Sequence, residues 1–378
     1  TRPGFAHKDG MTKSKTPPPP VRALYALLLI AAGLLLWLLA QPKPGVRVVT
    51  LRPVLAPEAP PAPAAVERLR VATYNLEHFT DARHDGPERT PELFIAHARG
   101  AAAVIAEADP DILLLQEVEN ARALIFLNEQ FARPYDYIYV TDLRRSSGPR
   151  DPLNLGLLSR LPPRQVRQLG FHALTGGASP ARGSLAAAFD LPGGASLLAY
   201  NIHLKSNYGE APRNQAQRAA ALHLIGADIV AETYRNLPRL TSALILGDTN
   251  VDPDTPQFAD DPSLEPLAGG FADLWLGRPI DERTTIPTRH AGEAGDPMLV
   301  FPPSAFDRVF ASKNLVANGP WRIAGPVAIQ QGTDTANNLT KPGENGHVSD
   351  HYLVYADLTP NPDYVPPPHP FAAPADAP

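Results

Sequence analysis

Short apolar runs alternate with longer segments of helical periodicity between residues 69 and 356, and this alternation predicts interleaved strands and helices. Thr90, Pro91 and Glu92 supply an N-cap, a first-turn proline and a first-turn acid, so a helix is predicted to begin there. The predicted helices cover residues 90–108, 120–132 and 212–234. The predicted strands cover residues 69–75, 111–115, 135–140, 154–159, 184–189, 196–203, 243–246, 305–311 and 351–356.

The order of these elements bounds the fold class. Helices separate some strands and short turns separate others, which implies mixed sheets with helical layers on their outer faces. With 378 residues and 44% apolar composition, the chain can bury the core of one domain of nearly 300 residues. We therefore predict an α/β or α+β layered sandwich.

Proline divides the chain into regions. Of its 44 prolines, four are consecutive at residues 17–20 and eight fall within residues 360–378. Such segments favour extended, polyproline-like linkers and tails. We predict an N-terminal tail at residues 1–20, a transmembrane anchor at 21–40, a Pro/Ala-rich linker at 41–65, a folded domain at 66–358 and a Pro-rich disordered tail at 359–378.

The predicted anchor rests on eighteen residues, 23–40, that carry no charge. As a helix they would extend about 27 Å, close to the ~30 Å hydrocarbon thickness of a bilayer. The alternative is a cleaved signal peptide, but Leu38 stands where an A-x-A-like site needs a small residue. Flanking basic residues favour a cytoplasmic N-terminus and an extracytoplasmic domain. The chain begins with Thr1, so it is either a fragment or an extended reading frame that starts at Met11.

Charge and cysteine content exclude some classes of protein. Residues 66–358 hold 26 basic and 35 acidic residues, unlike the basic surface of a protein that grips nucleic acid nonspecifically. A polyanionic substrate would have to be held locally, by a metal ion and a few basic side chains. No cysteine occurs, which removes disulfides, thiolate metal sites and cysteine nucleophiles.

Polar residues stand at the ends of most predicted strands. Carboxylate and carboxamide oxygens suit Mg²⁺, which keeps several waters and binds phosphate alongside, so this set predicts metal-assisted phosphoester hydrolysis. Lys205 and Arg182 are either phosphate contacts or ordinary surface residues. The strand-end candidates are Asn75, Glu117, His203, Asp248, Asn250, Asp307, Asp350 and His351.

Strand geometry constrains two of these pairs. Neighbouring residues in a regular strand point to opposite faces, so Asp350 and His351 can share a site only if the backbone there is still a loop. Asp248 and Asn250 are two residues apart, and an extended backbone would place both on the same side.

Six motifs in order carry a resemblance to a known superfamily. They are Thr-Tyr-Asn-Leu at 73–76, Leu-Gln-Glu-Val-Glu at 115–119, Asn-Leu-Gly-Leu-Leu-Ser-Arg at 154–160, Asn-Ile-His-Leu-Lys-Ser at 201–206, Leu-Gly-Asp-Thr-Asn at 246–250 and Ser-Asp-His-Tyr at 349–352. Residues 69–358 thereby resemble the endonuclease/exonuclease/phosphatase superfamily, as a bacterial-type membrane-anchored member. The resemblance implies a deoxyribonuclease I-like four-layer α/β/β/α sandwich with its site at one edge of two central sheets.

The resemblance also implies a role for each metal-side and water-side residue. Glu117 matches the family's principal Mg²⁺ ligand, for which Mn²⁺ is an expected substitute, and Asn75 matches its partner near the metal and phosphate. Asp350 matches an additional metal-side or phosphate-side carboxylate. Asp248 matches the carboxylate that orients or deprotonates the attacking water, and Asn250 the carboxamide that aligns that water.

Three further residues match groups beside the phosphate. His351 matches the imidazole next to the scissile phosphate, and Asp307 the acid that fixes its tautomer and favours its charged form. His203 resembles a second histidine of the deoxyribonuclease, sphingomyelinase and inositol phosphatase branches.

Together these matches predict a metal-dependent, nuclease-like phosphodiesterase, endonuclease or exonuclease, that acts by in-line attack of water. The expected substrate is nucleic acid, DNA or RNA, and the expected state is a single-pass membrane protein and a monomer. One alternative is a phospholipid, sphingomyelin or inositol-phosphate phosphoesterase, which a long exposed apolar hairpin near the site would favour. A second alternative is a catalytically inactive, membrane-tethered binding module.

Overall fold

The computed structural model describes residues 46–58, 66–81, 83, 89–144, 151–171, 174, 180, 182–290, 300–334 and 340–365. The chain divides into two units, residues 1–45 and 46–378, and the fold below belongs to the second unit. The predicted tail at residues 1–20 and the predicted anchor at 21–40 lie outside the described residues. Within the described part of the chain, no helix is both long and apolar enough to span a bilayer.

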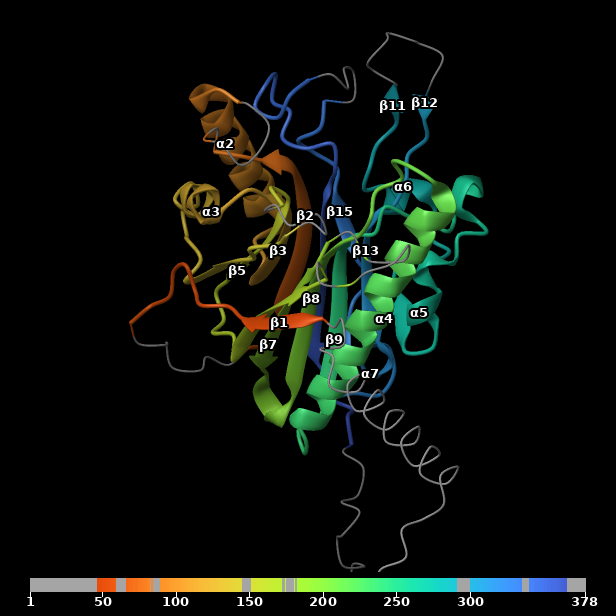
Figure 1. Ribbon diagram of the computed structural model, residues 1–378. Helices are drawn as coiled ribbons and strands as arrows, with labels where there is room; N and C mark the ends of the chain where they lie inside the picture. The colour runs from red at the N-terminus through yellow and green to blue at the C-terminus, as the bar shows by residue number, and fades with distance from the viewer. Residues whose placement is uncertain are drawn as a thin grey trace, which may run out of the picture. The chain divides into compact units, whose positions relative to one another are not determined.

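Two seven-stranded mixed sheets form the centre of the unit (Figure 1). The first sheet has the order β1 (Arg47–Thr50), β6 (Gln165–Gly170), β7 (Ser184–Asp190), β8 (Ser196–His203), β9 (Thr241–Asp248), β13 (Asp307–Ser312), β10 (Phe271–Asp273). The second has the order β14 (Trp321–Ile323), β16 (Leu353–Pro360), β2 (Leu69–Phe79), β3 (Ile112–Val118), β5 (Asn154–Ser159), β4 (Tyr137–Val140), with β15 (Val327–Ile329) also paired to β16.

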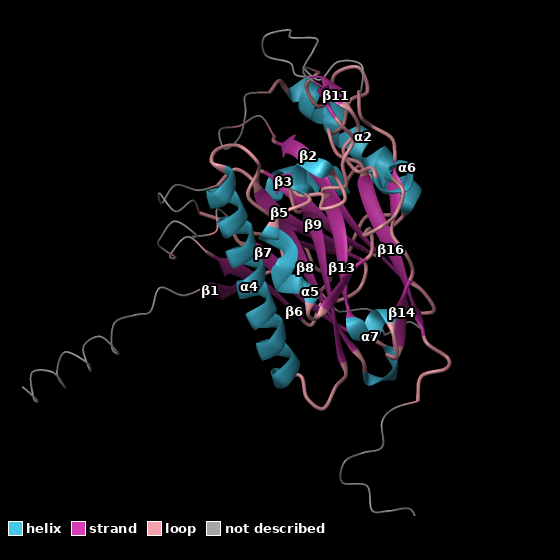
Figure 2. Ribbon diagram, turned by 90° about the vertical axis from the view of Figure 1, so that its right-hand side faces the viewer, coloured by secondary structure: helices cyan, strands magenta, loops and turns pink. Residues whose placement is uncertain are grey.

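Helices cover the outer faces of both sheets (Figure 2). One hydrophobic cluster lies between the sheets and joins side chains such as Leu114 of β3 and Leu246 of β9. A second cluster packs α2 (Pro91–Ala108) and α3 (Ala121–Asn128) on the second sheet, and a third packs α4 (Ala211–Arg235) and α5 (Glu265–Ala268) on the first. The predicted two-sheet sandwich with helical outer layers is thus confirmed. Two further short helices are α6 (Ile280–Arg283) and α7 (Lys313–Val316).

On the second sheet, the start of α2 was predicted correctly and the end of α3 was not. Thr90 caps α2 by accepting a hydrogen bond from the Leu93 amide, as predicted. The helix predicted for residues 120–132 ends at Asn128, because the Asn128 side chain bonds both backbone polar groups of Tyr135, with donor–acceptor distances of 2.8 and 3.1 Å. This side-chain turn competes with the helix and reverses the chain.

The predicted linker at residues 41–65 is corrected in part, because residues 46–58 belong to the folded unit. β1 pairs antiparallel with β6 at the edge of the first sheet. The chain then crosses to the second sheet, where the Val54 amide donates to the Ile138 carbonyl at 2.7 Å. Val48 and Val49 give β1 the β-branched composition of a strand, whereas the prolines around it suggested a linker.

The predicted boundary at residue 358 is also corrected. β16 runs to Pro360, and Asn361 is buried with its side chain donating to the Gly319 carbonyl at 2.8 Å. A proline at the end of a strand removes one ladder donor only, so it does not prevent pairing. Residues 366–378 of the predicted tail lie outside the described residues.

A small hairpin lies apart from both sheets. β11 (Arg289–His290) pairs with β12 (Val300–Phe301), and the Phe301 side chain is 47% exposed. Its base adjoins the bridge between Ile286 and Ser304.

Candidate functional site

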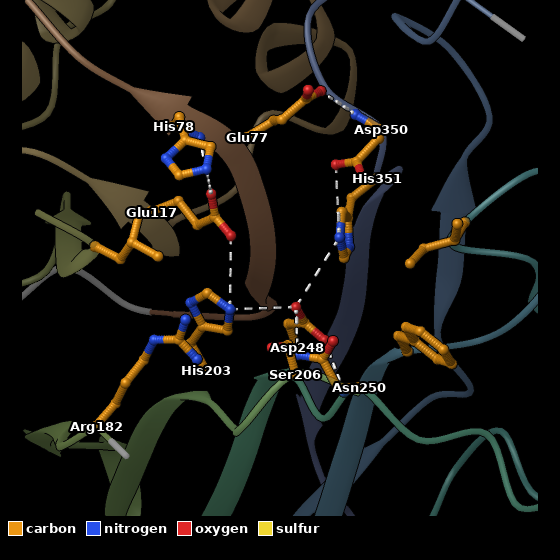
Figure 3. Close-up of a pocket in the computed structure, with 13 residues that line it drawn as sticks. Glu77, His78, Glu117, Arg182, His203, Ser206, Asp248, Asn250, Asp350 and His351 are labelled. Atoms are coloured by element: carbon orange, nitrogen blue, oxygen red, sulfur yellow. Dashed lines mark hydrogen bonds and ion pairs between the residues drawn. The ribbon is translucent and has the colours of Figure 1, made fainter. Parts of the chain in front are cut away.

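A pocket of about 360 Å³ opens where strand ends of the two sheets meet. The second sheet supplies its residues from β2, β3 and the loop before β16, and the first supplies them from β8, β9 and the loop before β13 (Figure 3). Most side chains in the lining are charged or polar, with an apolar part from Leu153, Ile286 and Phe306. The polar lining residues are Glu77, His78, Glu117, Arg182, His203, Ser206, Asp248, Asn250, Asp350 and His351.

Strand register brings three predicted residues of the first sheet side by side. His203 of β8 is the parallel partner of Asp248 in β9, and Asp307 of β13 is its antiparallel partner. Gly247 permits this close approach, since a Cβ atom there would lie 2.0 Å from the Ile202 carbonyl oxygen and its φ is +135°. Only glycine adopts such a backbone without strain.

Asp248 and Asn250 share the site through a turn, not through the extended backbone that the sequence suggested. Asn250 has a φ of 56°, and its amide donates to Asp248 Oδ1 at 2.7 Å. The side-chain nitrogens of Asn250 and Asn75 donate to Asp248 Oδ2 at 3.1 and 3.2 Å. Burial raises the pKa of Asp248 to about 7, against the opposing effect of His351. This carboxyl group can therefore accept a proton near neutral pH.

His351 is held by Asp307 from the opposite sheet. The loop before β16 lasts until Tyr352, so Asp350 and His351 both line the pocket, as the loop argument required. His351 Nδ1 lies 2.7 Å from Asp307 Oδ2. Burial favours the neutral imidazole, but the charges of Asp307, Asp350 and Asp248 outweigh it and raise the pKa of His351 to about 10. The imidazole is thus a cation at neutral pH and can only donate.

His203 has the opposite electrostatic environment. Its Nε2 lies 3.6 Å from Glu117 Oε1 and 3.5 Å from Asp248 Oδ2, and its Nδ1 has no hydrogen-bond partner among the described residues. Burial, with nearby Arg182 and His351, holds the pKa of His203 well below its usual range. This imidazole is neutral.

Both strands at the metal-side edge carry a bulge. The β2–β3 register shifts between Asn75 and Phe79, and the β3–β5 register shifts after Leu115. Glu117 sits in this irregular segment with a φ of 60°, a backbone that side chains with a Cβ rarely adopt. Such strained bulges occur at active sites, where they aim a side chain. β3 therefore continues to Val118, three residues beyond its predicted end at residue 115.

The three predicted metal ligands have different partners in the structure. The Asn75 oxygen accepts the Glu77 amide at 3.0 Å, so it is the Asn75 nitrogen that lies 3.4 Å from Glu117 Oε1. Asp350 Oδ1 lies 3.6 Å from His351 Nε2. No three His, Asp or Glu side chains among the described residues are placed to hold an ion together. Glu117 and Asp350 both line the pocket, and Mg²⁺ binds through one or two carboxylates, substrate phosphate and waters.

The two predicted phosphate contacts differ. Arg182 lines the pocket while its Nη1 donates to the Leu204 carbonyl at 3.0 Å. Lys205 instead turns into its own loop, where Nζ donates to the carbonyls of Ser206 at 2.9 Å and Tyr208 at 2.7 Å. Arg182 is therefore the better placed of the two to meet a phosphate.

An interacting pair at the site, Glu77 and His347, was missed from the sequence. Glu77 lines the pocket, and its Oε2 lies 2.8 Å from Nε2 of the buried His347. Both lie within a few residues of matched motifs, in Asn-Leu-Glu at 75–77 and in His-Val-Ser-Asp-His at 347–351. That proximity was the signal available in the sequence.

A two-sheet sandwich with carboxylates, carboxamides and two histidines at adjoining strand ends defines a phosphoester hydrolase of the nuclease and phosphatase kind. Residues 72–351 match the Endonuclease/Exonuclease/phosphatase family, and the chain belongs to that family. Its members typically depend on a divalent metal. No curated protein matches the sequence.

This chain is similar to solved structures at low sequence identity. TDP2 from C. elegans has a TM-score of 0.51 at 18% identity, over 77% of this chain and 75% of that one. A truncated form of Caenorhabditis elegans TDP2 has the same TM-score and identity over 77% of this chain and 97% of that one. D. rerio TDP2 complexed with single strand DNA product has a TM-score of 0.49 at 17% identity, over 78% of this chain and 100% of that one.

Proposed function

We propose that this protein is a Mg²⁺-dependent phosphodiesterase that cleaves nucleic acid by in-line attack of water on phosphorus. The observation that carries the proposal is the opposed pair of histidines around Asp248. A cationic His351, a neutral His203 and a carboxyl group with a pKa of about 7 meet in one pocket. These are the charge states that a hydrolytic attack on an anionic phosphodiester needs.

Asp248 is the base in this proposal. Its two oxygens are held by Asn250 and Asn75, so the carboxylate has one orientation in the pocket. Water bound to Asp248 would face the phosphorus and lose a proton to the carboxylate during attack. Asn250 fixes the angle of that carboxylate through both its amide and its side chain.

The two histidines would stabilise the negative charge that develops on the phosphate oxygens during attack. His351 keeps its protons at neutral pH and donates to a non-bridging oxygen, where charge accumulates in the transition state. His203 would donate a hydrogen bond to the leaving oxygen from a neutral ring, and that oxygen would take its proton from a water molecule as the P–O bond breaks. A divalent cation held by Glu117 would supply further neutralisation of the phosphate charge when bound.

Nucleic acid is the proposed substrate class, and a phospholipid is the alternative. The lining favours an anionic phosphodiester, since Arg182 and His351 bring positive charge into a folded unit that is otherwise acidic. The alternative has its own observation, because β11 and β12 form a separate hairpin that adjoins Ile286 of the pocket and exposes Phe301.

A substrate panel tests the proposal. Purified protein with Mg²⁺ or Mn²⁺ is incubated with plasmid DNA, single-stranded DNA, RNA, sphingomyelin vesicles and inositol phosphates, with Glu117→Ala as the control. We expect turnover of nucleic acid that Glu117→Ala loses. Turnover of sphingomyelin or inositol phosphate alone would show that the protein is a lipid or inositol-phosphate phosphoesterase. No turnover of any phosphoester would favour an inactive binding module.

We further propose that residues 21–40 anchor the protein and place the catalytic unit outside the cytoplasm. The uncharged eighteen-residue run supports this. Membrane fractionation followed by carbonate extraction and protease protection tests it. Recovery of the full-length chain in the soluble fraction would contradict the anchor.

A further inference from the structure

Glu77 links two parts of the pocket that belong to the second sheet, the end of β2 and the loop before β16. It occupies the β2 bulge with a φ of 46°. Its amide donates to Asn75 Oδ1 at 3.0 Å. Its Oε2 accepts from the Asp350 amide at 2.8 Å (Figure 3). One residue thus contacts the strand end that carries Asn75 and the loop that carries His351.

His347 holds the Glu77 carboxylate through a hydrogen bond. His347 is only 5% exposed, and its Nδ1 accepts a hydrogen bond from the Asp334 amide at 3.0 Å. A ring whose Nδ1 accepts must carry its proton on Nε2 when neutral, and that Nε2 lies 2.8 Å from Glu77 Oε2. The donor to Glu77 is therefore set by the backbone of the loop that contains Asp334.

The loop before β16 has a second tie to the same strand. Ser349 Oγ donates to the Asn75 carbonyl at 2.7 Å and accepts from the His351 amide at 3.0 Å. Together with the Asp350 amide, these bonds fix the backbone on both sides of Asp350. The orientation of His351 toward the phosphate side then depends on Asp307 for its ring and on this loop for its backbone.

We propose that Glu77 and His347 are a positioning pair that holds the Asp350–His351 loop against the Asn75 strand end, on the basis of the phosphodiesterase function proposed above. Glu77 does so as a hydrogen-bond acceptor. Its Oε2 is already shared by the Asp350 amide and His347, so the role requires an oxygen at that place and not a negative charge. The pair acts through His351 and Asn75, and does not itself contact the reacting atoms.

Four variants separate this role from a charged one. Glutamine at position 77 keeps an acceptor oxygen and removes the charge, whereas alanine removes both. Supporting residues of this kind typically contribute about 10- to 100-fold, so Glu77→Ala should lower kcat by that factor with KM nearly unchanged. Glu77→Gln should stay within about threefold of wild type. His347→Leu should follow Glu77→Ala, and His347→Gln, which keeps a donor near Nε2, should recover most of the activity.

Matched controls and a second readout complete the test. His223→Leu and Glu58→Ala alter exposed residues of the same types and should leave kcat unchanged. In NMR spectra, Glu77→Ala and His347→Leu should shift the His351 imidazole resonances, and His223→Leu should not. An equal loss of kcat in Glu77→Gln and Glu77→Ala would show that charge matters and would overturn the pair, as would wild-type activity in all four variants.

The readouts also distinguish this proposal from the proposed function. If wild type hydrolyses no phosphodiester, the proposed function fails. The NMR comparison still tests whether Glu77 and His347 position His351. Unshifted His351 resonances in folded Glu77→Ala would then overturn it. If wild type is active and Glu77→Ala matches it, only the pair fails.

Discussion

His203 and His351 face each other across one pocket, are buried to nearly the same extent and have opposite charge states. They are 3% and 5% exposed, yet the pKa of His203 lies well below the usual range and the pKa of His351 is raised to about 10. Burial alone would favour the neutral ring in both. The difference comes from the surrounding charges: Asp307, which lies 2.7 Å from His351 Nδ1, acts with Asp350 and Asp248 to raise the pKa of His351, whereas Arg182 and His351 add to the effect of burial on His203.

The charged groups around a buried imidazole therefore decide whether burial keeps it neutral. His351 can stabilise negative charge and cannot act as a base at neutral pH. His203 offers one N–H from a neutral ring, because burial, with Arg182 and His351 nearby, keeps its pKa low.

Removing His351 should have the largest effect. His351→Ala deletes the cation that would stabilise the developing charge on phosphate, so kcat should fall by about 10³- to 10⁴-fold. The measurement is steady-state cleavage of a phosphodiester with Mg²⁺, with His223→Ala as the exposed control. A loss smaller than that of His203→Ala would reverse the assigned roles.

Removing the charge of Asp307 should have the next largest effect. Asp307→Asn can keep a hydrogen bond to His351 Nδ1 but loses the attraction that raises the His351 pKa. The imidazole would then lose its proton as pH rises through a lower pKa, so kcat should fall about 10²-fold at pH 8 and less at pH 6. A pH–rate profile parallel to that of wild type would contradict this prediction.

Removing His203 should cost less than either change. His203→Ala deletes one neutral hydrogen-bond donor, which corresponds to a loss in kcat of about 10- to 30-fold. A substrate with an activated leaving group, such as bis(p-nitrophenyl) phosphate, should reduce that loss, because its leaving oxygen needs little help. The same loss on both substrates would place His203 elsewhere in the mechanism.

Replacing Arg182 should have the smallest effect. Arg182→Ala removes a positive charge from the pocket wall, so KM for an anionic substrate should rise about five- to tenfold with little change in kcat. Arg182→Lys should retain most of the affinity, and Lys205→Ala should leave KM near wild type. A larger effect from Lys205→Ala would mean that its loop opens on binding substrate.

Much of the fold was predictable because its buried strands are apolar. The span predicted for β8 is the observed one, and α2 was predicted within one residue. β6 was missed because two of its buried side chains are polar. Arg167 of β6 binds both oxygens of Asp228 in α4 at 2.8 Å, and Gln168 bonds the backbone of Asp142, so the strand does not look like a buried one in sequence.

The site was predictable in its residue types and not in its hydrogen bonds. The strand-end residues Asp248, Asn250, His203 and Glu117 do line one pocket. The left-handed turn at Asn250 and the partner of Glu77 depend on contacts between residues far apart in sequence, which no local pattern encodes. Lys205 resembled a phosphate ligand in the sequence, but its ammonium group donates a hydrogen bond to the Tyr208 carbonyl in its own loop.

The most direct test of the contrast is an NMR titration of the two imidazoles. ¹⁵N spectra of histidine-labelled protein, assigned with His203→Ala and His351→Ala, would follow both rings between pH 5 and pH 10 in the absence of divalent metal. We expect that His351 remains protonated until the pH approaches about 10, while His203 stays neutral throughout. A His351 that titrates near its ordinary pKa, or a His203 that is charged at neutral pH, would contradict this expectation.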